Sequence, residues 1–189
     1  MGILDSINSG AFSMVNQMVS PGLNFIMKYW AESFYIILPL IALYLYLKKD
    51  KNLIPYAVAV VVMFAISEII KDIVKEPRPC SLQDYSWINH IGCESGYGFP
   101  SGHATTLTGL FFFMKNYKYV RTAYIIWLIV TLFGRIYLGQ HYFTDVAAGV
   151  VIGLVGSYLL YRYEDLINGV AKKLCGPIIK VLGVNAGDS

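Results

Sequence analysis

The sequence predicts an all-helical integral membrane protein with about five transmembrane helices and an amphipathic surface helix at each end. Two observations carry this prediction. Hydrophobic residues make up 56% of the 189 residues and charged residues only 14%, which is too apolar for a soluble domain with one core. The apolar residues also gather in stretches close to the roughly 20 residues that a helix needs to cross a bilayer.

The predicted spans follow one another with short connections. Their limits are 30–47, 53–74, 101–119, 121–139 and 145–162. The third is the least hydrophobic, because Lys115, Asn116 and Lys118 interrupt its end, and it crosses the bilayer only if these side chains snorkel to the interface. The last two spans are joined by a few residues around Gly139 and Gln140, so they are expected to be antiparallel neighbours.

The flanking segments each show one apolar face. At the N-terminus, apolar side chains recur at helical spacing until Pro21-Gly22 breaks the pattern. No cation precedes Lys28, so the basic start of a signal peptide is missing and the segment is expected to stay on the chain. The C-terminal tail repeats the amphipathic pattern with more lysines, which predicts a second surface helix and not a sixth span. The expected organisation is one membrane domain over 1–189, with a surface segment 1–28, a transmembrane core 30–162 and an amphipathic tail 163–189.

Three short polar clusters stand at the ends of the apolar segments. They are Lys71 with Arg78-Pro79, then Pro100-Ser101-Gly102-His103, then Arg135 with His141 and Asp145. Fixed cations, imidazoles and a carboxylate from several hydrophobic segments make sense if those segments gather them around a multiply charged anion. Phosphate is the anion that this set fits best, since phosphoryl transfer depends on positioning and on stabilising charge on oxygen.

The first cluster also has a simpler interpretation. Lys71 and Arg78 could be interface anchors at the end of a span, as most such cations are. Pro77 and Pro79 hold the backbone of Arg78 extended, however, and an anchor does not need that restraint. Glu68 lies one turn before Lys71 and, as a carboxylate within the membrane, is expected to pair with a neighbouring lysine.

The other two clusters read in two ways as well. Ser101 could be only a helix N-cap, but a helix start also offers free backbone N–H groups to a phosphate, and Gly102 lets the ligand approach closely. His141 and Asp145 are four residues apart, so on a helix they share a face and the carboxylate can orient one imidazole nitrogen. A purely structural pair is the alternative. His90 has no such cluster around it and is assigned no role.

The order and spacing of the clusters, K-x6-RP, PSGH and R-x5-H-x3-D, resemble the tripartite signature of the type 2 phosphatidic acid phosphatase (PAP2) superfamily. This superfamily shares its fold with vanadium-dependent haloperoxidases. The resemblance covers roughly residues 30–162. It departs at Gly134, where the pattern usually carries Ser before the Arg, and this puts one phosphate-facing hydroxyl in doubt.

The resemblance implies a division of labour. The His matching His141 attacks phosphorus to form a phosphohistidine, the Asp matching Asp145 orients it, and the His matching His103 protonates the leaving oxygen. The residues that hold the phosphoryl oxygens match Lys71, Arg78, Ser101, Gly102 and Arg135. Because the carboxylate cluster that binds a metal is missing from the motifs, no metal or other cofactor is expected.

The implied function is hydrolysis of a membrane lipid phosphate or diphosphate. The stretch Glu76-Pro77-Arg78-Pro79-Cys80 resembles dolichyl diphosphatases, which favours a polyprenyl diphosphate, whereas Cys93-Glu94-Ser95-Gly96 resembles glucose 6-phosphatases. Phosphatidate and phosphatidylglycerol phosphate are alternative substrates.

Three other classes of protein are alternatives. A serine hydrolase would use Ser101, but Phe99 replaces the first Gly of G-x-S-x-G. A lipid-binding or transport protein would not need both His141 and Asp145. A haloperoxidase would carry the same motifs, but its known relatives are soluble.

Alternation of the spans places all three clusters on one side of the membrane. The other side holds ten of the fifteen cations, which are Lys48, Lys49, Lys51, Lys115, Lys118, Arg121, Arg162, Lys172, Lys173 and Lys180. Excess positive charge marks the cytoplasmic face. We therefore expect a multi-pass protein of the cell membrane whose site faces outward. The net charge of +3 follows from this asymmetry, and no nucleic-acid partner is expected.

The cysteines fit the same map. Cys80 and Cys93 bracket a twelve-residue stretch on the predicted outer side, while Cys175 lies in the predicted cytoplasmic tail. In an oxidising exterior the first two could form a disulfide; the alternative is two free thiols. Their spacing does not indicate a zinc site.

Overall fold

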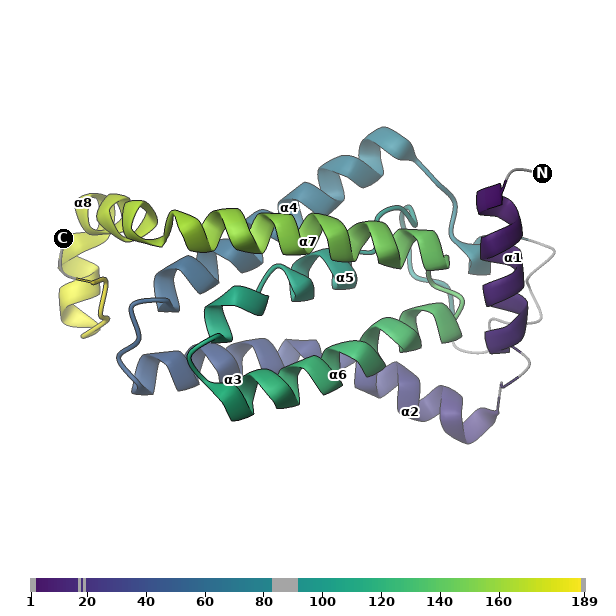
Figure 1. Cartoon of the computed structure of the whole chain (residues 1–189), viewed down its shortest axis with the longest axis horizontal. Coiled ribbons are helices and arrows are strands. Elements are labelled where there is room, and N and C mark those ends of the chain that lie inside the picture. The colour runs from purple at the N-terminus through teal and green to yellow at the C-terminus, as the bar shows by residue number, and fades with distance from the viewer. Residues whose placement is uncertain (1–2, 17, 19, 83–91, 188–189) are drawn as a thin grey trace.

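The computed structural model describes residues 3–16, 18, 20–82 and 92–187, and these form a bundle of helices (Figure 1). The described helices are α1 (Ile3–Asn16), α2 (Pro21–Glu32), α3 (Phe34–Leu47), α4 (Leu53–Val74), α5 (Gly102–Thr108), α6 (Lys118–Tyr137), α7 (Phe143–Arg162) and α8 (Glu164–Val181), with 3-10 turns η1 (Pro79–Ser81) and η3 (Phe111–Met114). No strand occurs in this described part of the chain. The predicted all-helical class is confirmed.

Four helical stretches are long and apolar enough to cross a membrane. They are 21–47, made of α2 and α3, then 53–74, 118–137 and 143–162. Their outer faces expose large apolar side chains such as Tyr35 and Val61, as expected of surfaces that meet lipid. The first stretch begins at Pro21, earlier than predicted, because the Ser20 hydroxyl caps α2 and Pro21 fits its first turn. Residues 1–28 are therefore not a single surface segment.

The predicted third span, 101–119, is not one helix. It consists of α5, which ends at Thr108 with Gly109 as its C-cap, and of η3 after a short turn. The backbone N–H of Phe112 donates to the Ser157 hydroxyl on α7 at 3.2 Å, and this bond takes the place of one within a helix. Five spans are thus not confirmed. The reason is a side-chain contact with α7, which the residue pattern of the segment does not reveal.

Glycines on α7 allow α5 to pack directly against it. A Cβ added to Gly149 would lie 2.9 Å from the Ser101 carbonyl oxygen, and one added to Gly153 would lie 2.5 Å from that of Thr105. Since real side chains do not tolerate such distances to backbone, these positions require glycine. The close approach places the start of α5 beside the start of α7, where two of the polar clusters lie.

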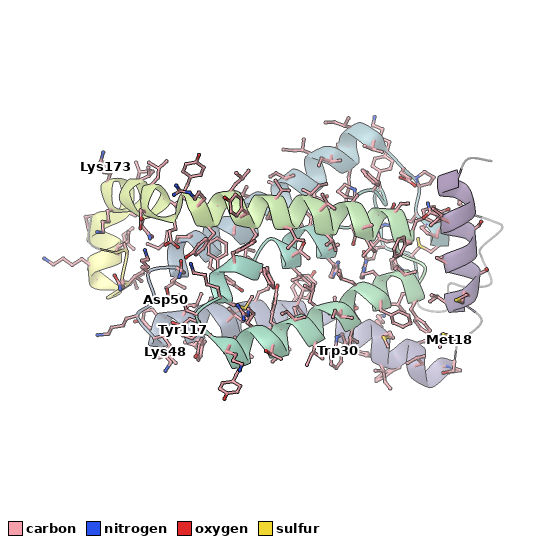
Figure 2. The ribbon with its side chains drawn as sticks, viewed as in Figure 1. Met18, Trp30, Lys48, Asp50, Tyr117 and Lys173 are labelled. Carbon is pink, nitrogen blue, oxygen red and sulfur yellow. A yellow bond between two sulfur atoms is a disulfide. The ribbon has the colours of Figure 1, made fainter. Side chains whose placement is uncertain are left out.

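The terminal helices α1 and α8 lie across opposite ends of the bundle (Figure 1). Helix α1 is joined to the start of α7, where Asn8 Oδ1 accepts the Thr144 N–H at 3.2 Å. Helix α8 is joined to the start of α4, because Asn168 donates to the Lys51 carbonyl at 3.1 Å. Figure 2 labels Lys48, Asp50, Tyr117 and Lys173 at the α8 end and Met18 at the α1 end. Both predicted terminal helices are present, and α8 is kinked at Cys175.

Candidate active site

The three polar clusters meet at the α1 end of the bundle. Lys71 lies in the last turn of α4, and Arg78 follows in extended backbone (φ −71°, ψ 149°) between its two prolines. Arg135 lies in the last turn of α6, and His141 lies in the connection from α6 to α7. Helix ends therefore bring residues from four separate segments to one place, as the spacing predicts.

Arg78 organises the centre of the site. Its side chain is 5% exposed. Its Nη1 lies 3.1 Å from the Gln140 carbonyl oxygen and 3.1 Å from Nε2 of His141, and its Nε donates to the Gly96 carbonyl at 3.3 Å. A guanidinium has only donors. Nε2 of His141 must therefore accept, and the proton of the neutral imidazole lies on Nδ1.

Asp145 faces that Nδ1 proton. Its Oδ2 lies 3.5 Å from Nδ1 of His141 and accepts the Tyr142 N–H at 2.8 Å. The prediction that the two residues share a helical face is wrong, because α7 begins only at Phe143, after His141. Instead Asp145 is the third residue of α7, and its side chain turns back to accept the backbone N–H of the N-cap residue Tyr142. The carboxylate can still orient the imidazole, since both groups are fully buried.

Burial, together with Arg135 and Arg78, lowers the pKa of His141 well below its ordinary value. The imidazole is thus neutral at physiological pH, which is the form with a free lone pair. A neutral imidazole whose proton faces a carboxylate can act as a nucleophile through Nε2 once Arg78 releases that nitrogen.

Helix α5 supplies the second histidine. Its N-cap is Ser101, whose hydroxyl accepts the Ala104 N–H at 3.4 Å, and whose own N–H donates to the Asp145 carbonyl at 3.1 Å. The capping interpretation of Ser101 is therefore confirmed. His103, in the first turn, packs edge-on against the Phe34 ring with centroids 4.7 Å apart. This contact fixes the imidazole at the boundary between polar and apolar parts of the site.

Lys71 pairs with Glu68 at 2.5 Å. This agrees with the expectation that Glu68 pairs with a neighbouring lysine. Its Nζ would lie 3.2 Å from a Cβ added to Gly102. A side chain at position 102 would therefore crowd the ammonium group. The glycine keeps the start of α5 open beside this cation.

A cavity of about 260 Å³ lies in front of these groups. Its polar wall contains Glu68, Lys71, Arg78, Glu94, Gly102, His103, Thr106 and His141, and its apolar wall includes Phe34, Leu38, Val60 and Phe64. A second cavity of about 240 Å³ is lined by residues that include Lys28, Glu32, Glu94, Arg135 and Gln140. Of the predicted site residues, five line the first cavity and Arg135 lines the second. Ser101 and Asp145 line neither and support the walls from behind.

Sequence reasoning missed Glu94 and Gln140. Glu94 Oε2 lies 2.5 Å from Arg135 Nη2 and 3.5 Å from Arg78 Nη2. Burial opposes ionisation of Glu94, but Arg135 and Arg78 outweigh it and lower the pKa of the carboxyl group. The Gln140 side chain holds this loop by accepting the Glu94 N–H at 3.0 Å. The resemblance of residues 93–96 to glucose 6-phosphatases pointed to the segment that contains Glu94 but gave this residue no role.

Of the two alternatives for Cys80 and Cys93, the structure has the disulfide, with 5.6 Å between the Cα atoms. It connects the segment that carries Arg78 to the one that carries Glu94. Cys175 is a free, exposed thiol. His90 lies outside the described residues.

Gly134 has a different environment from the one its motif position suggests. A Cβ added there would lie 3.6 Å from Met27 Sδ and 3.8 Å from the Met27 carbonyl oxygen. The position therefore faces α2. A serine side chain at this position would therefore start between α2 and α6, and not on the wall of the first cavity.

The donor set contains few metal ligands. Among the described residues, no group of three or more His, Cys, Asp or Glu side chains could hold a metal ion. The groups that line the first cavity are cations and imidazoles, which suit an anion.

Fold and site together define the class of protein, an all-helical protein with membrane-spanning candidate helices and a cationic, histidine-containing site at one end of the bundle. The sequence model of the PAP2 superfamily matches residues 52–168, and the chain belongs to this superfamily.

Individual relatives differ in how much of their length is matched. The chain is 30% identical over 115 residues to a lipid A 4'-phosphatase of Bacteroides thetaiotaomicron, covering 56% of this chain and 51% of that protein. It is 26% identical over 174 residues to an undecaprenyl-diphosphatase of Sulfolobus acidocaldarius, covering 88% of this chain and 82% of that protein. The chain thus spans about half of the first relative and most of the second.

Solved structures share the fold. A transmembrane PAP2-type phosphatidylglycerolphosphate phosphatase from Bacillus subtilis matches with a TM-score of 0.72 at 19% identity, over 88% of this chain and 89% of that one. LpxE from Aquifex aeolicus matches with a TM-score of 0.73 at 22% identity, over 86% of this chain and 100% of that one. At this identity the matches establish the fold alone.

Proposed function

We propose that the protein hydrolyses a membrane lipid phosphate or diphosphate through a phosphohistidine on His141. The observation that carries the proposal is the placement of His141, which lines a cationic cavity with its Nε2 against Arg78 and its Nδ1 facing the Asp145 carboxylate. This is the orientation that a nucleophilic imidazole needs. A purely structural His–Asp pair would not require a neighbouring anion site.

The first chemical step forms a bond between Nε2 and phosphorus. When a phosphate enters, the Arg78 N–H that now contacts Nε2 at 3.1 Å shifts to a phosphoryl oxygen and frees the lone pair. Lys71, Arg135 and the backbone N–H groups at the start of α5 bind the remaining oxygens. Burial and the nearby Arg135 lower the pKa of His103 to about 3, and the negative charge of a bound phosphate raises it again, so that the imidazole takes up a proton. The bond between phosphorus and the leaving oxygen breaks, and the protonated His103 gives its proton to that oxygen.

The second step releases inorganic phosphate. A water molecule attacks the phosphohistidine, His103 accepts its proton, and the P–N bond breaks. Lys71, Arg78 and Arg135 supply the positive charge that metal ions supply in many phosphoryl-transfer enzymes. The proposed reaction therefore needs no metal ion.

The apolar wall of the cavity supports a lipid substrate. Phe34 and Leu38 come from α3, and Val60 and Phe64 come from α4. Both helices belong to candidate spans. A lipid tail can thus lie along α3 and α4 while the headgroup contacts the cations.

Among lipid phosphates we favour a polyprenyl diphosphate. The resemblance of residues 76–80 to dolichyl diphosphatases supports this choice. Undecaprenyl-diphosphatases from Sulfolobus acidocaldarius and Bacillus subtilis are also matched over 82% and 78% of their lengths. Phosphatidylglycerol phosphate is the second candidate, because a Bacillus subtilis phosphatidylglycerophosphatase B is 29% identical over 120 residues.

We also propose that the protein lies in the cell membrane with the site on the extracytoplasmic side. The support is the cation asymmetry, with ten of fifteen Lys and Arg residues on the opposite side. An outward site suits carrier lipids that are released as diphosphates on that face.

A substrate panel tests the proposal. Purified protein in detergent is assayed for phosphate release from a polyprenyl diphosphate, phosphatidate and phosphatidylglycerol phosphate, each in excess EDTA. We expect hydrolysis to persist in the chelator, with the highest kcat/KM for the diphosphate. Binding without hydrolysis of any lipid would favour a lipid-binding protein. Loss of activity in EDTA that magnesium restores would contradict the metal-independent mechanism.

A further inference from the structure

The Glu94 carboxylate occupies the place between two arginines of the proposed phosphate site. Its Oε2 is within 2.5 Å of Arg135 and 3.5 Å of Arg78, whose side chains are 3% and 5% exposed. Paired guanidinium groups bind a carboxylate and a phosphoryl group with the same kind of hydrogen bonds. A substrate phosphate that uses both arginines must therefore displace Glu94.

The backbone of Glu94 is fixed, but its side chain has room to move. The Glu94 N–H is bonded to Gln140, and Cys93 is held by the disulfide. The Glu94 side chain is nevertheless 46% exposed. Rotation about its side-chain bonds can move the carboxylate while the loop stays in place.

The second cavity offers the displaced carboxylate a partner. Glu94 lines both cavities, so a rotation of its side chain leads from the first to the second. Lys28 of α2 lines the second cavity. Within the described part of the chain, Lys28 forms no ion pair with any acid. Among the described residues it is thus a cation with no acidic partner, and it lines the same cavity as the carboxylate that must move.

We propose that Glu94 is a displaceable occupant of the phosphate site and that Lys28 receives its carboxylate when a phosphate binds. This inference rests on the proposed function for the identity of the substrate, but not for the exchange itself. It makes Glu94 the residue that sets how tightly the site binds any anion, and Lys28 a positioning residue that acts through Glu94.

The consequence is a threshold for anions. Displacement of Glu94 costs the same free energy for every ligand that uses both arginines, so it lowers all affinities by one factor. A terminal phosphate, which has more charge and more free oxygens, still binds. The headgroup of a phosphodiester lipid has one charge and binds weakly, so the threshold keeps it out even where such lipids are abundant in the bilayer.

Binding of inorganic phosphate tests the exchange without requiring hydrolysis. We would measure Kd by isothermal titration calorimetry for wild type, Glu94→Gln, Lys28→Gln and the double variant in one detergent. Glu94→Gln keeps the shape and removes the competing charge, so we expect Kd to fall roughly ten-fold, the factor that corresponds to about 1.4 kcal/mol. Lys28→Gln should raise Kd a few-fold in wild type and leave it unchanged in the Glu94→Gln background.

The matched control is Glu32→Gln. Glu32 also lines the second cavity but pairs with neither arginine, so Kd should stay within about two-fold because an exposed charge is well screened. Thermal unfolding of each variant verifies that it is folded. Unchanged or weaker phosphate binding by Glu94→Gln would overturn the proposal. An equal effect of Lys28→Gln in both backgrounds would overturn the role of Lys28, because the lysine would then attract phosphate directly.

A second measurement addresses the threshold for weakly binding lipid headgroups. In mixed micelles, phosphatidylglycerol should hardly inhibit phosphate release by wild type but should inhibit Glu94→Gln competitively. Equal inhibition of both proteins would refute the threshold. If neither protein hydrolyses any lipid, the proposed function fails, while the calorimetric result still decides whether Glu94 competes with phosphate.

Discussion

At the scale of single residues, the protonation of His141 follows from its two neighbours. Arg78 can only donate, so it fixes Nε2 as the acceptor, and Asp145 faces the proton on Nδ1. These two neighbours are enough to fix which imidazole nitrogen carries the proton. The protonation of the proposed nucleophile therefore depends on three side chains in contact, those of Arg78, His141 and Asp145.

Asp145→Asn tests this chain. The amide offers an N–H or a neutral oxygen to Nδ1, so it no longer stabilises the imidazole orientation or its developing charge. We expect kcat to fall by roughly two to four orders of magnitude with a small change in KM. Steady-state kinetics of folded protein measure this. Wild-type kcat in the variant would show that the pair is merely structural.

The sequence predicted those site residues whose spacing is characteristic, and it missed those recruited by the loop. His141, Asp145 and Arg78 stand at fixed intervals from helix ends, so their types and positions indicated chemistry. Glu94 and Gln140 act through contacts between segments 46 residues apart, and no local pattern encodes such a contact. The helical-face argument for His141 and Asp145 was wrong about geometry, since the helix begins after the histidine.

At the scale of helices, the contact between α5 and α7 positions the start of α5. The Thr105 hydroxyl donates to the carbonyl of the N-cap residue Ser101, and the Thr108 hydroxyl donates to the carbonyl of Ala104. The glycines of α7 leave room for α5 to pack closely against that helix. Because α5 has only seven residues, its position depends on this packing and not on a long run of helical hydrogen bonds. The sequence predicted a full span at this point because hydropathy does not distinguish a buried helix from a lipid-facing one.

Gly153→Ala tests the packing. Its added Cβ would lie 2.5 Å from the Thr105 carbonyl oxygen and 2.9 Å from the Gly109 nitrogen, and backbone cannot yield cheaply. We expect a loss of about 1–3 kcal/mol in unfolding free energy and a lower thermal midpoint in detergent. Gly169→Ala in α8 is the control, because its Cβ would meet nothing within 4 Å. Equal midpoints for both variants would contradict the close contact.

At the scale of the whole molecule, the bundle has two chemically different ends. The proposed site and α1 lie at one end, and the starts of α4 and α6 lie at the other with α8. The membrane class was predictable because spans are encoded by composition over about 20 residues. The start of the first span was not predictable, because polar residues interrupt the apolar pattern of α2.

Cysteine labelling tests the proposed orientation. Ser95→Cys at the site end and Asn116→Cys at the other end are both exposed positions, and each is combined with Cys175→Ser so that no other free thiol remains among the described residues. In intact cells, a membrane-impermeant maleimide should label position 95 and not position 116 until the membrane is opened. Labelling of position 116 alone would place the site in the cytoplasm.

The central claim is that His141 attacks phosphorus, and rapid quenching with a lipid substrate labelled in its terminal phosphate tests it most directly. Wild type should yield a phosphoprotein that is labile to acid and stable to alkali, as a phosphoramidate is. His141→Ala should yield none. Ser101→Ala should still form it, since that hydroxyl serves as a helix cap. An alkali-labile adduct that requires Ser101 and survives loss of His141 would contradict the account.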